Sequence, residues 1–230
     1  MEFFTKKTVE FLQQMGSNNS KEWFALHKDE YEQYIKTPSQ AFAQEMGEHL
    51  MALEPTITFA PKINHSLFKI YRDTRRMGAN KQPLKERIGL IWWHGSGKRL
   101  QSSSFYIHFD TKEIFVSAGV RWFEKPLLDA YRATIQDEKK REELAAILEL
   151  LVAKGYKVIE KGFKRYPRGF DKEMSYSELS LYKGMAVYTT LDIEHLFEGE
   201  KFIDTLFGIY EEMLPLEQFM YEVSLRVDCE

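Results

Sequence analysis

The sequence predicts an α+β fold, with helices at both ends of the chain and a central, mostly antiparallel sheet. Apolar residues recur at helical spacing in the first fifty residues and again after residue 126. Between these regions, residues 105–122 alternate in polarity on either side of a polar turn, which is typical of a β-hairpin. The chain has 230 residues, 43% of them hydrophobic, so we expect a single domain over residues 1–230.

The N-terminal third predicts three helices. The first carries an apolar stripe of Val9, Leu12 and Met15. It ends at Gly16, a typical C-terminal cap. Asn19, followed three residues later by Glu22, resembles a capping box and predicts the start of the second helix. The third begins near Pro38 and ends before Pro55.

The middle of the chain changes to a strand-like pattern. Three segments rich in β-branched and aromatic residues predict neighbouring strands: Ile88–Trp93, Phe105–Phe109 and Ile114–Trp122. Asp110–Glu113 predicts the turn of a hairpin between the second and the third. The polar segment His94–Ser104 predicts the loop between the first and the second.

The C-terminal half returns to helices. One helix is predicted to begin at Pro126, and another to run from Asp137 to Lys154 before Gly155. Pro215 predicts a break near the end of the chain, because its ring cannot continue a helix. The other predicted elements are the strands Tyr156–Glu160 and Met185–Leu191 and the helices Phe202–Met213 and Leu216–Val223.

The composition predicts a soluble, cytoplasmic protein. No segment approaches the ~20 apolar residues that cross a bilayer, and the N-terminus lacks the pattern of a signal peptide. Cys229 is the one cysteine, which excludes an intramolecular disulfide and a two-cysteine metal site. No two of the six histidines lie three to five residues apart, as a helical zinc site requires. We therefore expect no metal, no cofactor and no membrane contact.

Catalytic motifs do not identify a reaction. Gly95, Gly97 and Lys98 suggest a phosphate-binding loop, but Trp92 stands where the motif needs glycine and Arg99 where it needs serine or threonine. A loop that joins two strands is the better interpretation. The Gly-x-Ser-x-Gly elbow of serine hydrolases is missing as well. The sequence leaves open whether the protein is an enzyme, and no catalytic residue is assigned.

Positive charge is concentrated in two stretches of an acidic chain. Residues 69–87 hold seven basic and two acidic residues, and residues 157–172 hold six and two. Together they carry a net charge of +9, which leaves −12 on the rest of the chain. A local positive patch on an acidic body favours a compact anionic ligand over a broad nucleic-acid groove.

The first stretch suggests an anion site built around arginine. Arg72, Asp73 and Arg75 lie within four residues, so Asp73 can orient one guanidinium while the other faces a ligand. The planar fork of arginine suits carboxylate and phosphate groups. Lys81 and Lys85 follow a glycine-containing turn and can approach the same anion.

The second stretch contains a turn rich in cations and aromatic rings, Phe163–Asp171. Lys164, Arg165 and Arg168 lie in it, and Tyr166 can stack on a flat ligand. We expect this turn to meet the first stretch. The predicted ligand site is Arg72, Asp73, Arg75, Lys81, Lys85, Lys164, Arg165 and Arg168. Its ligand is expected to be a small phosphorylated or carboxylated molecule.

Three other interpretations of the basic stretches stay open. A protein–protein module can dock an acidic partner on them, with Trp92, Trp93 and Trp122 as anchoring residues. Nucleic-acid binding is less favoured, because the net charge of −12 on the rest of the chain repels a phosphate backbone. A purely structural ion-pair network around Arg72 and Arg75 is the third.

These residues also resemble a known family of bacterial proteins, the domain of unknown function number 2461. Its pattern, Arg-x-x-Arg-Asp-x-Arg-Phe followed by Asp or Asn, Lys and Tyr, is matched at Arg72, Asp73, Arg75, Asn80 and Lys81. The chain departs from the pattern at Lys69, Arg76 and Leu84. The similarity extends to the early segment from Asn18 to Phe24 and to the turn Lys164–Asp171. The resemblance implies no activity and no catalytic residues.

Overall fold

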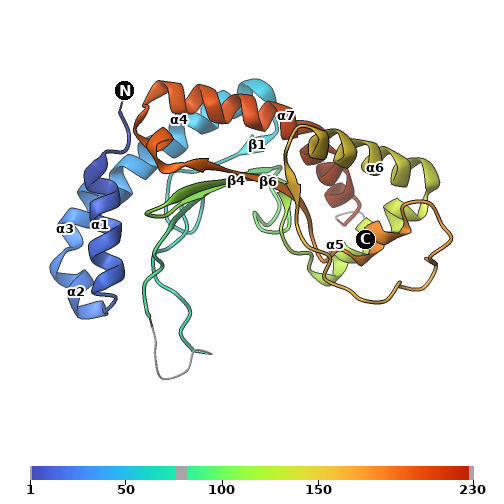
Figure 1. Ribbon diagram of the computed structural model, residues 1–230, viewed down its shortest axis with the longest axis horizontal. Coiled ribbons are helices and arrows are strands. Elements are labelled where there is room, and N and C mark those ends of the chain that lie inside the picture. Colours follow the sequence, from blue (N-terminus) through green and yellow to red (C-terminus); the bar gives the residue numbers. More distant parts are fainter. Residues whose placement is uncertain (1, 76–81, 228–230) are drawn as a thin grey trace. The chain divides into compact units, whose positions relative to one another are not determined.

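The computed structural model describes residues 2–75 and 82–227 (Figure 1). As predicted, it is an α+β protein, with N-terminal helices, a six-stranded antiparallel sheet and a long C-terminal helix. The chain forms two compact units, each built from three segments. Unit 1 comprises Met1–Trp92, Tyr106–Val116 and Thr190–Gly208; unit 2 comprises Trp93–Phe105, Ser117–Thr189 and Ile209–Glu230. The expectation of a single domain stays a prediction.

The predicted central strands and their hairpin are confirmed. The strand order is β1-β2-β3-β4-β6-β5. The strands are β1 (Ile57–Thr58), β2 (Ile88–His94), β3 (Ser104–Phe109), β4 (Glu113–Val120), β5 (Lys157–Val158) and β6 (Met185–Asp192). At the β3–β4 turn, the Asp110 carboxylate accepts hydrogen bonds from the backbone N–H groups of Lys112 at 2.7 Å and Glu113 at 3.1 Å. This local bonding explains why the turn was visible in the sequence.

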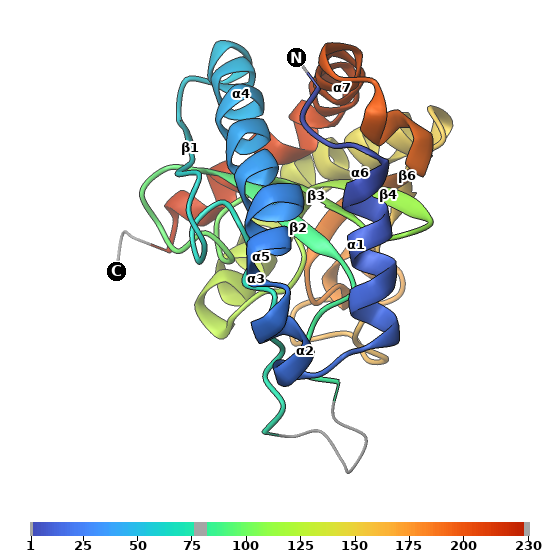
Figure 2. The ribbon, with the colours of Figure 1, turned by 90° about the vertical axis from the view of Figure 1, so that its left-hand side faces the viewer.

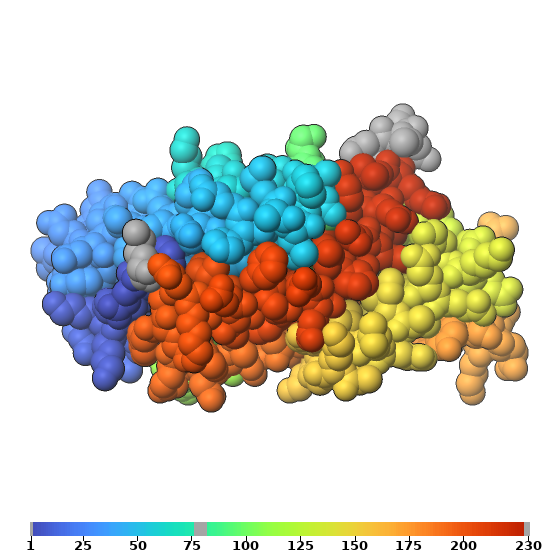
Figure 3. Space-filling model, turned by 90° about the horizontal axis from the view of Figure 1, so that it is seen from above, coloured from blue at the N-terminus to red at the C-terminus, as the bar shows by residue number. Residues whose placement is uncertain are grey.

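Unit 1 packs its helices on one face of its strands (Figure 2). Its helical segments are α1 (Lys6–Ser17), α2 (Lys21–Leu26), α3 (Lys28–Tyr31), the π-helical η1 (Glu32–Lys36), α4 (Thr37–Leu53), the 3₁₀ turn η3 (Ile193–Phe197) and the first turns of α7 (Glu200–Leu225). Phe42 of α4 lies 6.3 Å from the ring of Trp92 and 5.5 Å from that of Phe202. The Trp92 indole donates a hydrogen bond to the Ala43 carbonyl at 2.9 Å. Figure 3 shows the blue α4 and the orange start of α7 side by side on this face.

The two faces of these strands differ in burial. Ile107, Phe109 and Val116 are fully buried on the helix-covered face. Their sequence neighbours Tyr106, His108 and Phe115 are only half-buried. Successive side chains of a strand point to opposite faces, so the aromatic residues lie on the other face of the sheet.

Unit 2 forms a second core around helices. Its helical segments are α5 (Lys125–Gln136), α6 (Glu138–Ala153), the 3₁₀ turn η2 (Ser177–Leu181) and the later turns of α7. The buried Arg141 guanidinium donates to the carbonyls of Ser175 at 2.7 Å, Ile135 at 2.9 Å and Gln136 at 3.2 Å. The bonds to Ile135 and Gln136 satisfy carbonyls at the end of α5, which have no partner within the helix.

The predicted capping box at Asn19 is wrong. Ser20 is the N-cap of α2, and its hydroxyl accepts a hydrogen bond from the Trp23 backbone N–H at 3.1 Å. Ser and Asn are both good capping residues, so the local pattern did not separate them. The Asn19 side chain instead makes long-range contacts, described below.

The predicted break at Pro215 is also wrong, because α7 continues through it from Glu200 to Leu225. A proline inside a helix costs about 3 kcal/mol. Met213, Leu216 and Met220 on either side of Pro215 are fully buried. Each such side chain contributes roughly 1.5–3 kcal/mol through burial, so packing outweighs the lost hydrogen bond.

Two glycines test the backbone constraints of this fold. Gly119 has φ +113°, and a Cβ there would overlap the Met185 carbonyl oxygen, far closer than van der Waals contact allows. Gly119→Ala should therefore destabilise the protein by several kcal/mol. Gly208 lies inside α7 with open space around it, so Gly208→Ala should stabilise by about 0.5–1 kcal/mol. Urea unfolding of both variants measures the difference, and equal midpoints would contradict this account.

Candidate functional sites

The first basic stretch forms a two-stranded arm in unit 1. We call its described residues, 69–75 and 82–87, the basic arm. The Arg72 backbone N–H donates to the Pro83 carbonyl at 2.8 Å, and the Lys85 N–H donates to the Ile70 carbonyl at 2.8 Å. These bonds hold the two segments of the arm antiparallel to each other, with Tyr71 and Leu84 paired in an isolated antiparallel β-bridge.

Asn19 fastens the arm to the N-terminal helices. Its side-chain oxygen accepts a hydrogen bond from the Leu84 backbone N–H at 2.9 Å, and its amide donates to the Leu84 carbonyl at 3.1 Å. The amide also lies 3.2 Å from a carboxylate oxygen of Glu86. Leu84 is fully buried, so its backbone N–H and C=O need hydrogen-bond partners within the protein. The side-chain amide of Asn19 supplies both, as a neighbouring strand would.

Asp73 binds one of the two predicted arginines. The Arg75 guanidinium donates to the Asp73 carboxylate through Nε at 2.9 Å and Nη2 at 2.6 Å, a fork-to-fork pair. Hydrogen bonds from Arg75 hold the pKa of Asp73 below its usual value, so this carboxylate is ionised at neutral pH. Arg72 is half-buried and forms no ion pair or side-chain hydrogen bond with any other described residue.

Lysines add charge at the base of the arm. The Lys85 ammonium donates to the Lys69 carbonyl at 2.8 Å and lies 5.7 Å from the centre of the Phe68 ring. Phe68 in turn meets the Tyr106 ring edge-on at 5.7 Å. The arm therefore joins the aromatic face of the sheet. Lys81, also predicted for the site, lies outside the described residues.

The second stretch is an exposed turn in unit 2. Lys164, Arg165 and Arg168 are exposed, and none of them forms an ion pair with another described residue. The adjacent Gly169 has φ +88°, and the Gln136 amide donates to its carbonyl at 2.8 Å. The hydrogen bond from Gln136 fixes the backbone of the turn, while the cationic side chains are exposed to solvent.

An aromatic ring at the start of this turn lies between two cations. The Arg132 guanidinium lies 4.6 Å from the centre of the Phe163 ring, and the Lys183 ammonium lies 5.0 Å from it. Lys183 also lies 5.4 Å from the ring of Trp122, whose side chain is 57% exposed. Of the three tryptophans considered as anchors for a partner, Trp92 and Trp93 are buried and unavailable.

The arm belongs to unit 1 and the turn to unit 2. The meeting of Arg72, Asp73 and Arg75 with Lys164, Arg165 and Arg168 stays a prediction.

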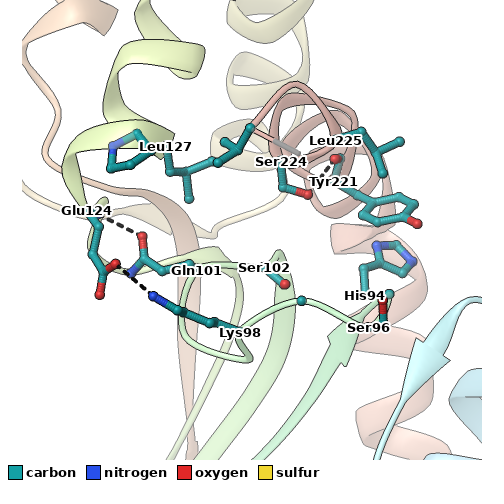
Figure 4. Close-up of a pocket in the computed structure, with 14 residues that line it drawn as sticks. His94, Ser96, Lys98, Gln101, Ser102, Glu124, Leu127, Tyr221, Ser224 and Leu225 are labelled. Carbon is teal, nitrogen blue, oxygen red and sulfur yellow. Dashed lines mark hydrogen bonds and ion pairs between the residues drawn. The ribbon is translucent and has the colours of Figure 1, made fainter. Parts of the chain in front are cut away.

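Unit 2 also contains a cavity of about 340 Å³ (Figure 4). Its walls are residues 94–102 of the β2–β3 loop, residues 124–127 at the start of α5 and residues 221–227 at the end of α7. Gly95 has φ +69°, and a Cβ there would lie 3.3 Å from the Tyr221 ring. The glycine thus permits both the turn of the loop and the close approach of the tyrosine.

A buried histidine–glutamate pair lies beside this cavity, and its histidine, His94, forms part of the wall. His94 Nδ1 lies 2.8 Å from Glu217 Oε2, and both side chains are fully buried. The Tyr221 ring packs on the imidazole at a centroid distance of 4.2 Å. This pair was not predicted from the sequence, where His94 was considered only as a metal ligand. The available signal was Glu217 itself, a charged residue between Met213 and Met220 on the buried stripe of α7.

Replacing Asn19 tests how the arm is held. Asn19→Ala leaves the N–H and C=O of buried Leu84 without partners, which should cost about 1–3 kcal/mol and speed amide exchange at Leu84. Asn18→Ala is the matched control, because the exposed Asn18 amide bonds to the Gln14 carbonyl and to no other described residue. Its effect should be within about 0.5 kcal/mol. Denaturation and hydrogen exchange measure both, and equal effects would contradict the anchoring role.

Comparison with known proteins gives a family and no activity. A family model described as conserved hypothetical protein (DUF2461) matches residues 7–219. No curated protein matches the chain. No helix among residues 2–75 and 82–227 is long and apolar enough to cross a membrane. Because the family match covers most of the chain, including the basic arm and the basic turn, the protein belongs to the DUF2461 family of conserved hypothetical proteins.

Proposed function

We propose that the protein binds a small phosphorylated or carboxylated ligand, and that the basic arm carries the central contact. The observation that supports this proposal is that the two arginines of the arm differ in their partners. Asp73 holds Arg75 through two short hydrogen bonds, while Arg72 has no such partner among the described residues. A half-buried guanidinium without a counter-charge favours an external anion.

The chemistry of the arm suits a compact anion. A guanidinium can donate two parallel hydrogen bonds to a carboxylate or phosphate, and lysine adds a point charge. Lys69 is exposed in the same arm, and the Lys85 ammonium is held at the base of the arm. Since Asp73 is ionised and engaged with Arg75, it neutralises one cation and leaves the others for the ligand.

A second candidate is docking of an acidic protein partner on the turn of unit 2. Its support is the exposed Trp122 beside the Lys183 ammonium, together with the unpaired cations of the turn. Tryptophan and arginine are frequent anchors of interfaces. Nucleic acid is a weaker candidate, because a net charge of −12 outside the two stretches opposes it. The proposal concerns binding, and no residue is assigned to catalysis.

A thermal-shift screen tests the anion site. The full chain is heated with phosphate, nucleotides, sugar phosphates and dicarboxylates at constant ionic strength, so that general screening is unchanged. A ligand at 100 times its Kd should stabilise by about 2.7 kcal/mol, which corresponds to roughly 5–10 °C. Arg72→Ala should abolish the shift, and Arg72→Lys, which keeps the charge but loses the fork, should restore part of it.

The control for lost charge is Arg121→Ala, at an exposed arginine of unit 2 that pairs with no other described residue. It should leave the shift unchanged. Stabilisation that survives Arg72→Ala would remove the arm as the site. Stabilisation that instead disappears in a variant of Lys164, Arg165 and Arg168 would move the site to the turn of unit 2.

A further inference from the structure

The cavity of unit 2 contains a different set of polar groups from the basic arm. A buried pair of titratable side chains is costly, because both groups lose their hydration and their mutual contact seldom compensates for all of it. His94 and Glu217 are fully buried, 2.8 Å apart, and His94 forms part of the cavity wall. Apolar side chains of the same size would stabilise the fold at least as well. Stability of the fold alone therefore does not explain why this pair lies at the cavity.

Ser102 adds an independent sign of a ligand. It lines the cavity and is only 6% exposed, yet its hydroxyl has no hydrogen-bond partner among the described residues (Figure 4). The Ser102 Oγ lies close to Gly97: a Cβ added to Gly97 would be 3.0 Å from this oxygen. The Ser102 oxygen is open to the cavity, so a ligand hydroxyl there can bond to it in place of water.

The two charged side chains at the rim of the cavity pair with each other. The Lys98 ammonium lies 3.8 Å from the Glu124 carboxylate, and both side chains are largely exposed. The walls therefore offer no surplus positive charge to an anion, unlike the basic arm.

The remaining polar groups match hydroxyl groups. The hydroxyls of Ser96 and Ser102 and the Tyr221 side chain line the cavity. Ser224 and Gln101 line it as well, but the Ser224 hydroxyl donates to a backbone carbonyl, and the Gln101 amide already bonds to backbone groups on both its oxygen and its nitrogen. Hydroxyls and amides both donate and accept hydrogen bonds, as the hydroxyls of a polyol do. The volume of about 340 Å³ lies at the lower end of ligand pockets, which favours a small compound.

We propose that this cavity binds a small uncharged polyhydroxy compound, such as a monosaccharide or a cyclic polyol. Ser102 hydrogen-bonds with one of its hydroxyls. The imidazole of His94, positioned from behind by Glu217, forms part of the wall against which the compound packs. The site is independent of the proposed anion function, because none of its residues belongs to the arm or to the basic turn.

Calorimetric titration of the full chain tests the proposal. The probes are D-glucose, D-ribose and myo-inositol, with glucose 6-phosphate and glycine as charged and zwitterionic comparisons. At least one uncharged probe should bind with a Kd below about 10 mM, in the range of weak small-ligand binding. Ser102→Ala should weaken it about 3- to 10-fold, the loss of one neutral hydrogen bond. Ser17→Ala, at an exposed serine of α1, and Arg72→Ala should not change it.

The role of Glu217 needs a readout other than stability. Glu217→Gln keeps the size of the side chain but should change the ¹⁵N signals of the His94 ring, because the acceptor facing Nδ1 is altered. Binding of the probe should weaken in the same variant. Unchanged ring signals or unchanged affinity would overturn the positioning role. The absence of binding by all uncharged probes, equal binding of the charged or zwitterionic ones, or an unaffected Ser102→Ala variant would overturn the site.

Discussion

Alternation of side chains along β3 and β4 is the constraint on which the rest of unit 1 depends. Ile107, Phe109 and Val116 are buried on the helix-covered face, and the residues between them carry aromatic rings on the other. A register shift of one residue would exchange the two sets, which makes the pairing highly specific. The same alternation places Tyr106 against Phe68, and through Phe68 it connects the sheet to the ammonium of Lys85 at the base of the basic arm.

The two proposed sites use opposite physical environments. The arm and the turn carry their charges in contact with water, where attraction is weak, depends on salt and is easily reversed. The cavity places His94 and Glu217 away from water, where each electrostatic contact is stronger and an unpaired group is costly. Binding of an anion at the surface and recognition of hydroxyls inside a cavity are therefore compatible in one chain.

Most of the secondary structure could be predicted from local sequence patterns. The exceptions are residues whose structure depends on contacts with distant parts of the chain. The hairpin turn at Asp110 and the helix before Gly155 depend on bonds between residues a few positions apart. Asn19 was misassigned because its partner is Leu84, 65 positions away. Pro215 was misassigned because a local penalty was outweighed by the burial of its neighbours.

The sequence by itself determined the fold class, the strands of the hairpin and the concentration of positive charge in two stretches, because period and composition are properties of neighbouring residues. Only the tertiary structure decided which arginine Asp73 binds and which residue supports Leu84. It also brought His94 to Glu217, 123 positions further along the chain, beside a cavity. Contacts of this kind depend on how whole elements pack, and no short segment of sequence contains that information.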